Sequence, residues 1–148
     1  MPHSYVSSLL HCVFSTKERR NLITDELQQR LWPYMGGIAR DNKMKALAVG
    51  GVADHAHLLL SIPSTISNSK AMQLIKGGSS KSIHDEFPEQ QRFAWQEGYG
   101  AFSVGISQVE ETKRYIANQR EHHRTKSYQE EFIAFLEKHG FEYDPQHV

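Results

Sequence analysis

The first part of the chain changes from strand-like to helix-like spacing of its hydrophobic residues. Tyr5 to Thr16 mixes β-branched, aromatic and small residues without a helical stripe, which indicates a strand. After a polar turn, apolar residues recur at helical spacing behind Thr24, whose hydroxyl can cap the first turn. Pro33 and the pair Gly36 and Gly37 interrupt this pattern, so we expect a kink or an early stop before the helix resumes.

The middle of the chain predicts two antiparallel strands and a long helix. Residues 45–52, K-A-L-A-V-G-G-V, form one strand, and Gly50 and Gly51 suit a tight connection or a bulge. Residues 52–63, V-A-D-H-A-H-L-L-L-S-I-P, are largely apolar and end at a proline, which is typical of an interior strand. From Ser67 the spacing is helical, and Gly77 and Gly78 either break this helix or weaken it.

The last part of the chain predicts one more strand and two helices. An aromatic, β-rich segment ends in a strand around Ala101 to Ser107. The sequence S-Q-V-E at 107–110 is a capping box, in which a hydroxyl and a carboxylate satisfy the first backbone donors of a helix. The sequence S-Y-Q-E at 127–130 repeats this signal and opens a last helix, for which Gly140 is a natural C-terminal cap.

The predicted order of elements is strand, helix, strand, strand, helix, strand, helix, helix. Its first six elements are the βαββαβ order of the ferredoxin-like arrangement, so the fold class is α+β with additional C-terminal helices. Two helices then cover one face of an antiparallel sheet and leave the other face open to bind a ligand. The 148 residues fit a single domain, 1–148.

Composition narrows the setting without naming a ligand. No segment approaches the roughly 18 consecutive apolar residues that a membrane span needs, and the N-terminus lacks the pattern of a signal peptide. Cys12 has no second cysteine to pair with, so we expect a reducing cytoplasm. Lys and Arg balance Asp and Glu at 17 each, so net charge gives no argument for nucleic acid.

Basic residues nevertheless gather locally, and each cluster is either a solvated face or part of a binding surface. The sequence K-G-G-S-S-K at 76–81 has the composition of a phosphate-binding segment, although it matches no P-loop and equally suits a polar interruption of a surface helix. Our candidates for phosphate contacts are Lys17, Arg19, Arg20, Lys76, Lys81 and Arg120.

Two histidines in the predicted interior strand carry the first chemical signal. His55 and His57 are separated by one residue, so their side chains project from the same face and can reach one divalent cation. The alternative is that one imidazole is hydrogen-bonded in the core and the other lies at an exposed strand end. His11 can line the same site if it shares their face, or it can be a half-buried histidine beside Cys12.

The helix after Ser107 carries the second signal. Tyr115 and Gln119 are four residues apart and share one face, with Glu111 and His122 on or near it. Gln119 offers an oxygen as third ligand for a hard cation such as Mg²⁺ or Mn²⁺. Such a site leaves open positions for metal-assisted phosphodiester cleavage, with Tyr115 as a nucleophile.

Several fragments, taken in order, resemble the single-tyrosine HUH transposases of bacterial insertion sequences and their relatives associated with repetitive extragenic palindromes. They are H-C-V-F-S-T-K-E-R-R, D-H-A-H-L-L-L-S-I-P, K-G-G-S-S-K-S, W-Q-E-G-Y-G-A-F-S-V-G-I-S and Y-I-A-N-Q-R-E-H-H-R. The chain departs from this family at Ala53, where proline is common, and in a C-terminus extended past the tyrosine helix.

The resemblance implies a ferredoxin-like, RNA-recognition-motif-like fold that cleaves and rejoins single-stranded DNA. By this similarity His55, His57 and Gln119 are the ligands of Mg²⁺ or Mn²⁺, and Tyr115 forms a 5′-phosphotyrosine link without a nucleotide cofactor. It also implies recognition of DNA hairpins and a homodimer with composite active sites, in which Tyr115 acts in cis or in trans.

Three alternatives stay open at this point. One is a domesticated enzyme that acts on dispersed palindromic repeats and does not mobilise its own gene. Another is a non-catalytic hairpin-binding module, although the presence of His55, His57, Tyr115 and Gln119 argues against it. A structural Zn²⁺ site is a weaker hypothesis, because a full set of four Cys or His ligands is missing.

Overall fold

A four-stranded antiparallel sheet forms the centre of the fold. The computed structural model describes residues 3–148, so residues 1–2, with which the predicted domain begins, lie outside it. The sheet has the order β2-β3-β1-β4. Its strands are β1 (Leu9–Ser15), β2 (Lys45–Val52), β3 (His55–Ser61) and β4 (Gly100–Ser103). This order and the βαββαβ sequence of elements confirm the predicted ferredoxin-like α+β fold.

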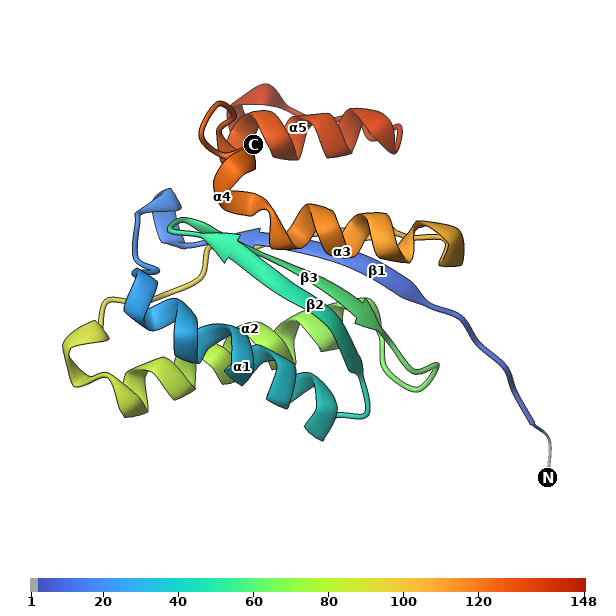
Figure 1. The fold of residues 1–148 in the computed structure, drawn as a ribbon, viewed down its shortest axis with the longest axis horizontal. Coiled ribbons are helices and arrows are strands. Elements are labelled where there is room, and N and C mark those ends of the chain that lie inside the picture. The colour runs from blue at the N-terminus through green and yellow to red at the C-terminus, as the bar shows by residue number, and fades with distance from the viewer. Residues whose placement is uncertain (1–2) are drawn as a thin grey trace.

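Helices cover both faces of the sheet (Figure 1). On one face lie α1 (Asp25–Asp41) and α2 (Asn68–Glu86), and on the other lie α3 (Val109–Ala117), α4 (Gln119–His122) and α5 (Tyr128–Lys138). Short 3-10 turns are η1 (Lys17–Arg19), η2 (Pro88–Gln90), η3 (Ile106–Gln108) and η4 (Pro145–His147). Across residues 3–148, no helix is long and apolar enough to span a bilayer.

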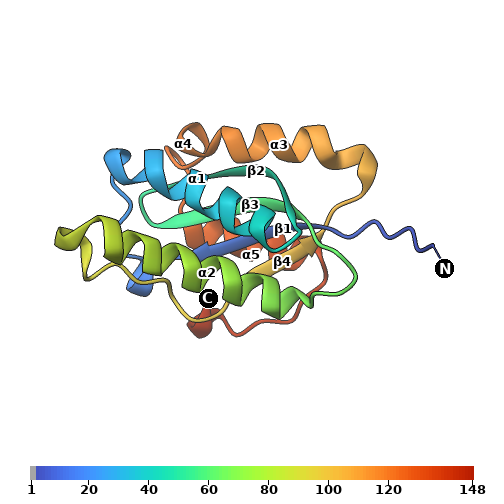
Figure 2. The ribbon, with the colours of Figure 1, turned by 90° about the horizontal axis from the view of Figure 1, so that it is seen from below.

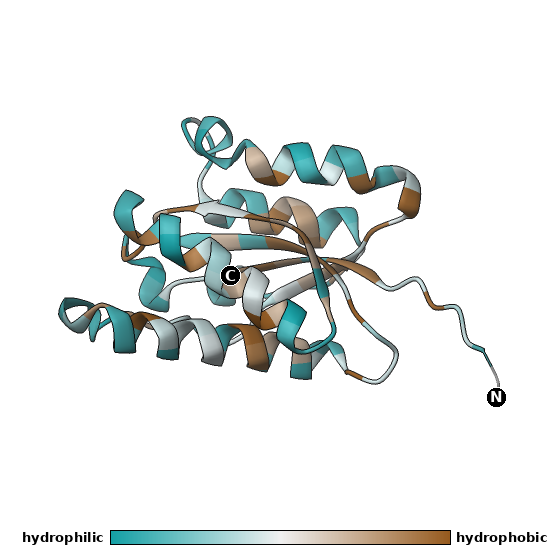
Figure 3. Ribbon diagram, turned by 60° about the horizontal axis from the view of Figure 1, so that its bottom comes forward, coloured by the Kyte–Doolittle hydropathy of each residue, from teal (hydrophilic) through white to brown (hydrophobic). Residues whose placement is uncertain are grey.

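Alternation along the strands divides the core into two layers. Cys12 and Phe14 of β1 and Leu58 of β3 belong to the main hydrophobic cluster, together with residues of α1 and α2. Figure 2 shows these two helices on the same side of the sheet. The odd-numbered residues of β1 and β3 face the other side of the sheet. There Val13 of β1 packs with Phe102 of β4 and with aromatic residues of α5. Hydrophobic positions recur along the strands and on the helices that cover them (Figure 3).

The second face of the sheet is therefore not open, which corrects our expectation. Tyr128, Phe132, Phe135 and Leu136 of α5 pack against Val13 and Phe102 of the sheet. The sequence pattern shows that α5 is amphipathic but not where its apolar side is buried. The residues that project from this face, including the two histidines, are consequently shielded by the C-terminal helices.

Both long helices run through the residues that were expected to interrupt them. In α1, Pro33 is exposed, and so is Gln29, whose carbonyl loses its partner and can bond to water. In α2, Gly78 faces Ile38 of α1, and a Cβ atom at Gly78 would lie 2.8 Å from Cδ1 of Ile38. This glycine therefore allows the two helices to approach each other, and the K-G-G-S-S-K segment is helix and not a phosphate loop.

Some of the predicted helix caps are confirmed and one is wrong. Thr24 and Ser127 cap α1 and α5 as expected, the latter with a full capping box to Glu130. The capping box expected at Ser107 is wrong, because Ser107 lies inside η3 and α3 begins at Val109. Gly140 follows α5 with φ of +73°, as a C-terminal cap requires.

The strand boundaries follow from which residues find a partner. β1 is shorter than the predicted Tyr5 to Thr16, because its ladder with β3 runs from Leu9 to Ser15. β4 ends at Ser103 and not at Ser107 for the same reason. Gly50 and Gly51 lie within β2 and form neither the connection nor the bulge, since the register of β2 shifts at Leu47.

Candidate active site of histidines, tyrosine and a buried carboxylate

His55 and His57 lie at the beginning of β3 and are both fully buried. Their side chains leave the same face of the strand, as the spacing predicts, and this face is the one covered by α3 and α5. A tight turn at Ala53 and Asp54 precedes them and joins β3 to β2. Both imidazoles are thus fixed on an interior strand.

Asp54 determines how the ring of His55 is oriented. Its Oδ1 lies 2.7 Å from Nδ1 of His55, and a carboxylate only accepts hydrogen bonds. Nδ1 therefore carries the proton, and Nε2 points away from Asp54 towards α4 and α5. A carboxylate behind an imidazole in this way is the usual partner of a metal-binding histidine.

His11 shares the face of the histidine pair, which agrees with the interpretation that His11 lines the same site. Its Nε2 lies 2.7 Å from Nδ1 of His57, and the two rings are 5.0 Å apart. Burial, together with the neighbouring His57, lowers the pKa of His11 to about 3. His11 is therefore a neutral partner that orients His57.

Tyr115 reaches this site because α3 packs directly on the backbone of β2. A Cβ atom at Gly50 would lie 2.6 Å from the carbonyl oxygen of Ile116, so only glycine fits there. The ring of Tyr115 lies 5.8 Å from the rings of His11 and His57. Tyr115, the candidate nucleophile, is thus close to His11 and His57 of its own chain.

Gln119 is buried and belongs to the same cluster, although the helix breaks before it at Asn118. Its Nε2 donates to the backbone carbonyl of Tyr115 at 3.1 Å. This hydrogen bond turns Oε1 towards the imidazoles, where it lies 3.4 Å from Nε2 of His55. The structure brings together the four residues that the sequence selected.

Two further residues join the cluster, and the sequence reasoning missed both. Oε1 of Glu131, in α5, lies 2.9 Å from Nε2 of His57 and 3.3 Å from Nε2 of His55. Nε2 of His123 lies 3.2 Å from the same oxygen. The hydroxyl of Tyr115 donates to the other oxygen, Oε2. Glu131 therefore contacts the histidines with one oxygen and the tyrosine with the other.

A sequence signal for Glu131 was available. It is one helical turn away from Tyr128 and from Phe135, so it stands as a charged residue on the apolar side of α5. A carboxylate in that position is costly to bury unless it is paired. His123 gives no comparable signal, because it follows another histidine in a polar stretch.

The electrostatics of the cluster follow from burial and from this pairing. Although burial works against it, hydrogen bonds from His123, His55 and His57 hold the pKa of Glu131 well below its usual range. Burial lowers the pKa of His57, whereas at His55 Asp54 and Glu131 outweigh burial and raise the pKa. Burial and the bond to Glu131 raise the pKa of Tyr115, so its phenol is protonated.

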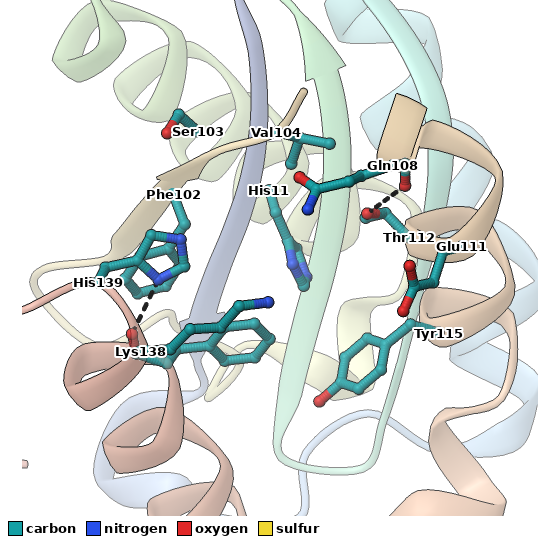
Figure 4. A pocket seen from close by; sticks show the side chains of 11 residues that line it. His11, Phe102, Ser103, Val104, Gln108, Glu111, Thr112, Tyr115, Lys138 and His139 are labelled. Atoms are coloured by element: carbon teal, nitrogen blue, oxygen red, sulfur yellow. Dashed lines mark hydrogen bonds between the residues drawn. The ribbon is translucent and has the colours of Figure 1, made fainter. Parts of the chain in front are cut away.

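A cavity of about 320 Å³ lies beside Tyr115. Figure 4 shows His11, from β1, and Tyr115, from α3, on its walls, with Phe102, Lys138 and His139 on the side opposite Tyr115. Glu111, which was expected near the face of Tyr115, lines this cavity, and the ring of His122 packs on Tyr115 at 4.4 Å. The cavity connects solvent to the tyrosine side of the cluster.

The predicted phosphate-binding residues are distributed over several surfaces. Lys17 and Arg20 are exposed at η1, where Arg20 pairs with Glu18 at 2.7 Å, and Arg19 lies over the ring of Tyr128. Lys81 pairs with Asp85, and Arg120 with Asp25. Lys76 differs from these, because its Nζ donates to the carbonyls of Gln96 and Gly98 at 2.7 and 2.8 Å.

The donor set fits a divalent cation. It combines imidazoles with an amide oxygen and a carboxylate oxygen, which are ligand types of Mn²⁺ and related ions, and all of these side chains are buried except that of His123, which is partly exposed. One ligand atom from each of His55, His57, His123 and Glu131 lies within 4.8 Å of all the others. Two atoms on opposite sides of one ion lie about 4.2 Å apart, so the cluster needs only a small contraction to hold it.

The comparisons with known proteins assign the chain to a class of DNA-processing enzymes. The family described as "Transposase IS200 like" matches residues 4–119, and the chain belongs to this family. It is therefore a DNA transposase by family. The matched residues end at Gln119, so His123 and Glu131 lie beyond them.

Individual proteins are similar to the chain in sequence or in fold. The transposase for insertion sequence element IS200 from Salmonella typhimurium strain LT2 is 28% identical over 126 residues, which cover 82% of each chain. A putative transposase from Deinococcus radiodurans R1 has a similar fold, with a TM-score of 0.63, 24% identity and coverage of 80% of this chain and 96% of that one. A REP-associated tyrosine transposase bound to a REP hairpin has a TM-score of 0.58 and 15% identity, with coverage of 80% and 70%.

Proposed function

We propose that this protein cleaves and rejoins single-stranded DNA through a covalent bond to Tyr115. The observation that carries the proposal is the position of the Tyr115 side chain, whose ring lies 5.8 Å from the ring of His57. His55, His57 and Gln119 would hold a divalent ion, Mg²⁺ or Mn²⁺. When bound, such an ion supplies positive charge that polarises the scissile phosphate.

The residues of the chain itself carry the nucleophilic step. Oη of Tyr115 attacks the phosphorus, so a tyrosyl O–P bond forms and the bond from phosphorus to the 3′ oxygen breaks. The strand is left with a 5′-phosphotyrosine on one side and a free 3′-hydroxyl on the other. Oε2 of Glu131 already accepts the phenolic hydrogen bond, so it is the atom placed to receive the proton. Attack by a second 3′-hydroxyl reverses the step and rejoins strands.

DNA reaches Tyr115 through the cavity beside it in this proposal. Its walls carry the half-buried Phe135, which offers a ring for stacking of an unpaired base, and the exposed Lys138, which offers charge for a phosphate. The substrate is DNA with a hairpin, a proposal supported by the family and by the relative that was solved with a REP hairpin. Lys17, Arg19 and Arg20 stay our candidates for phosphate contacts.

The arrangement also bears on assembly and on the alternatives. Tyr115 contacts Glu131 and His11 of its own chain, which supports cleavage in cis. The homodimer with composite sites stays a prediction. A non-catalytic hairpin-binding module would have no need for a tyrosine hydroxyl held beside buried imidazoles, which favours the enzymatic function.

The test is a denaturing gel of the protein incubated with hairpin-bearing single-stranded DNA from beside its gene and Mn²⁺. A band of covalent protein–DNA complex is expected for the wild type and not for Tyr115→Phe, which should still bind the hairpin. Tyr143→Phe is the matched control and should react normally, because the hydroxyl of Tyr143 bonds to the exposed Glu137, outside the cluster. Cleavage by Tyr115→Phe would remove the nucleophile assignment.

A further inference from the structure

We propose that Glu131 and His123, both beyond the family-matched residues, are direct ligands of the divalent ion together with His55 and His57. The positions of the hydrogen atoms in the cluster decide which atoms can bind a cation. Each imidazole has two ring nitrogens, and a neutral ring carries one proton. The partners of the outer nitrogens therefore determine what the inner nitrogens present to one another.

The outer nitrogens of two rings must carry the proton. Nδ1 of His55 faces the carboxylate of Asp54, and Nδ1 of His123 lies 2.5 Å from the backbone carbonyl of Lys126. Both partners are acceptors only, so both rings donate outwards. In their neutral forms, Nε2 of His55 and Nε2 of His123 then point bare lone pairs into the cluster.

The groups that these lone pairs meet are acceptors as well. Oε1 of Glu131 lies 3.3 Å from Nε2 of His55 and 3.2 Å from Nε2 of His123. Oε1 of Gln119 lies 3.4 and 3.1 Å from the same two nitrogens, and its orientation is fixed by the bond from Nε2 of Gln119 to Tyr115. Four lone-pair atoms therefore converge, and the neighbouring nitrogen that a neutral ring could protonate towards them is Nε2 of His57, which lies 2.9 Å from Oε1 of Glu131 and would carry its proton on Nδ1 instead when that atom donates to His11.

A buried group of acceptors requires positive charge at its centre. A divalent ion supplies this charge at once and leaves each imidazole in its ordinary neutral form, with Asp54 and Lys126 as the outer partners that metal-binding histidines require. Three imidazoles with a carboxylate suit Mn²⁺ better than Mg²⁺. The alternative is that extra protons on the rings satisfy Glu131, which would then be an internal ion-pair partner and no ligand.

The carboxylate of Glu131 then has two functions, because its second oxygen accepts the hydroxyl of Tyr115. α5 is tied to the sheet through the ion, and the nucleophile is tied to α5. This inference rests on the proposed function for the use of the ion, but its test needs no DNA.

The first measurement is the affinity of the protein for Mn²⁺, monitored through the electron paramagnetic resonance signal of the free ion. The wild type should bind one ion, and Glu131→Gln and His123→Gln should bind it at least tenfold more weakly. The matched controls Glu137→Gln and His122→Gln, one from an exposed position of α5 and one adjacent to His123, should bind as the wild type does. Unchanged affinity in Glu131→Gln, or no binding by the wild type, would overturn the proposal.

The second measurement uses only the wild type and does not depend on how a variant folds. Hydrogen exchange of the α5 amides, Tyr128–Lys138, should slow severalfold when Mn²⁺ is added, because the ion ties Glu131 to β3. A rate of hydrogen exchange in α5 that does not change when Mn²⁺ is added would contradict the assignment of Glu131 as a ligand. If Tyr115 still forms its DNA adduct in that case, the inference fails alone; if Glu131 binds the ion but no adduct forms, the proposed function fails alone.

Discussion

The hydroxyl of Tyr115 donates a hydrogen bond to Oε2 of Glu131, while Oε1 of the same carboxylate lies 2.9 Å from Nε2 of His57. One side chain thus joins the candidate nucleophile to the candidate metal ligands. Because Glu131 comes from α5, the site depends on a helix that follows the family-matched residues. The C-terminal helices are part of the site as well as a cover for the sheet.

Asp54 is expected to control metal affinity without touching the ion. Asp54→Ala removes the acceptor that holds the proton on Nδ1 of His55, so Nε2 is no longer fixed as a ligand. We expect Mn²⁺ to bind about 10 to 100 times more weakly, measured by titration. Asp85→Ala, which removes only an exposed pairing with Lys81, is the control. Equal affinity in Asp54→Ala and the wild type would show that Asp54 does not orient His55.

Gly50 is expected to tolerate no side chain. Gly50→Ala places Cβ against the carbonyl oxygen of Ile116, so α3 must move away from β2 and carry Tyr115 with it. We expect the free energy of unfolding to fall by about 1–3 kcal/mol, measured by urea denaturation, together with a loss of DNA cleavage. Gly77→Ala, at an open position of α2, should instead keep or raise stability by up to about 1 kcal/mol. A fully active and stable Gly50→Ala protein would contradict this packing.

Lys76 is expected to act in folding and not in DNA binding. Its Nζ holds the carbonyls of Gln96 and Gly98, and burial lowers its pKa. Lys76→Met should lower the free energy of unfolding by about 1–3 kcal/mol and leave the salt dependence of DNA binding unchanged. Lys17→Met should leave the free energy of unfolding unchanged. It should reduce the slope of log K for DNA binding against log salt concentration by roughly one. A reduced slope in Lys76→Met would restore Lys76 as a phosphate contact.

Cys12 is expected to be inert in the folded protein. Its side chain is fully buried, and burial raises its pKa to about 12, so roughly one thiol in 10,000 is ionised at pH 8. Ellman's reagent should therefore not react with the native protein, and one thiol should react after unfolding in guanidinium. Cys12 is the single cysteine of the chain, so any reaction reports on this residue. Rapid reaction without denaturant would show that the layer between β1 and α1 opens easily.

The sequence predicted those parts of the site that depend on local spacing. His55 and His57 share a face because strands have a period of two, and Tyr115 and Gln119 remain together although the helix breaks at Asn118. The contact of His57 with Glu131 spans 74 residues and depends on where α5 docks. No local pattern encodes that docking, so Glu131 and His123 were missed.

The same limit explains the errors in the fold. The role of Gly50 depends on α3, and that of Gly78 on Ile38 of a distant helix, so both glycines appear in the sequence as breaks or turns. Pro33 appears as an interruption because its exposure is not visible in the sequence. The order of strands and helices was predictable, because the hydrophobic period of each segment is a local property.

The most direct test of the central claim is mass spectrometry of the covalent complex with hairpin-bearing single-stranded DNA. After digestion with nuclease and trypsin, we expect a nucleotide adduct on the peptide Y-I-A-N-Q-R, residues 115–120, attached through the phenolic oxygen of Tyr115. The adduct should be absent when Tyr115 is replaced by Phe. An adduct on any other residue, or strand cleavage with no protein–DNA adduct, would contradict the assignment of Tyr115 as the nucleophile.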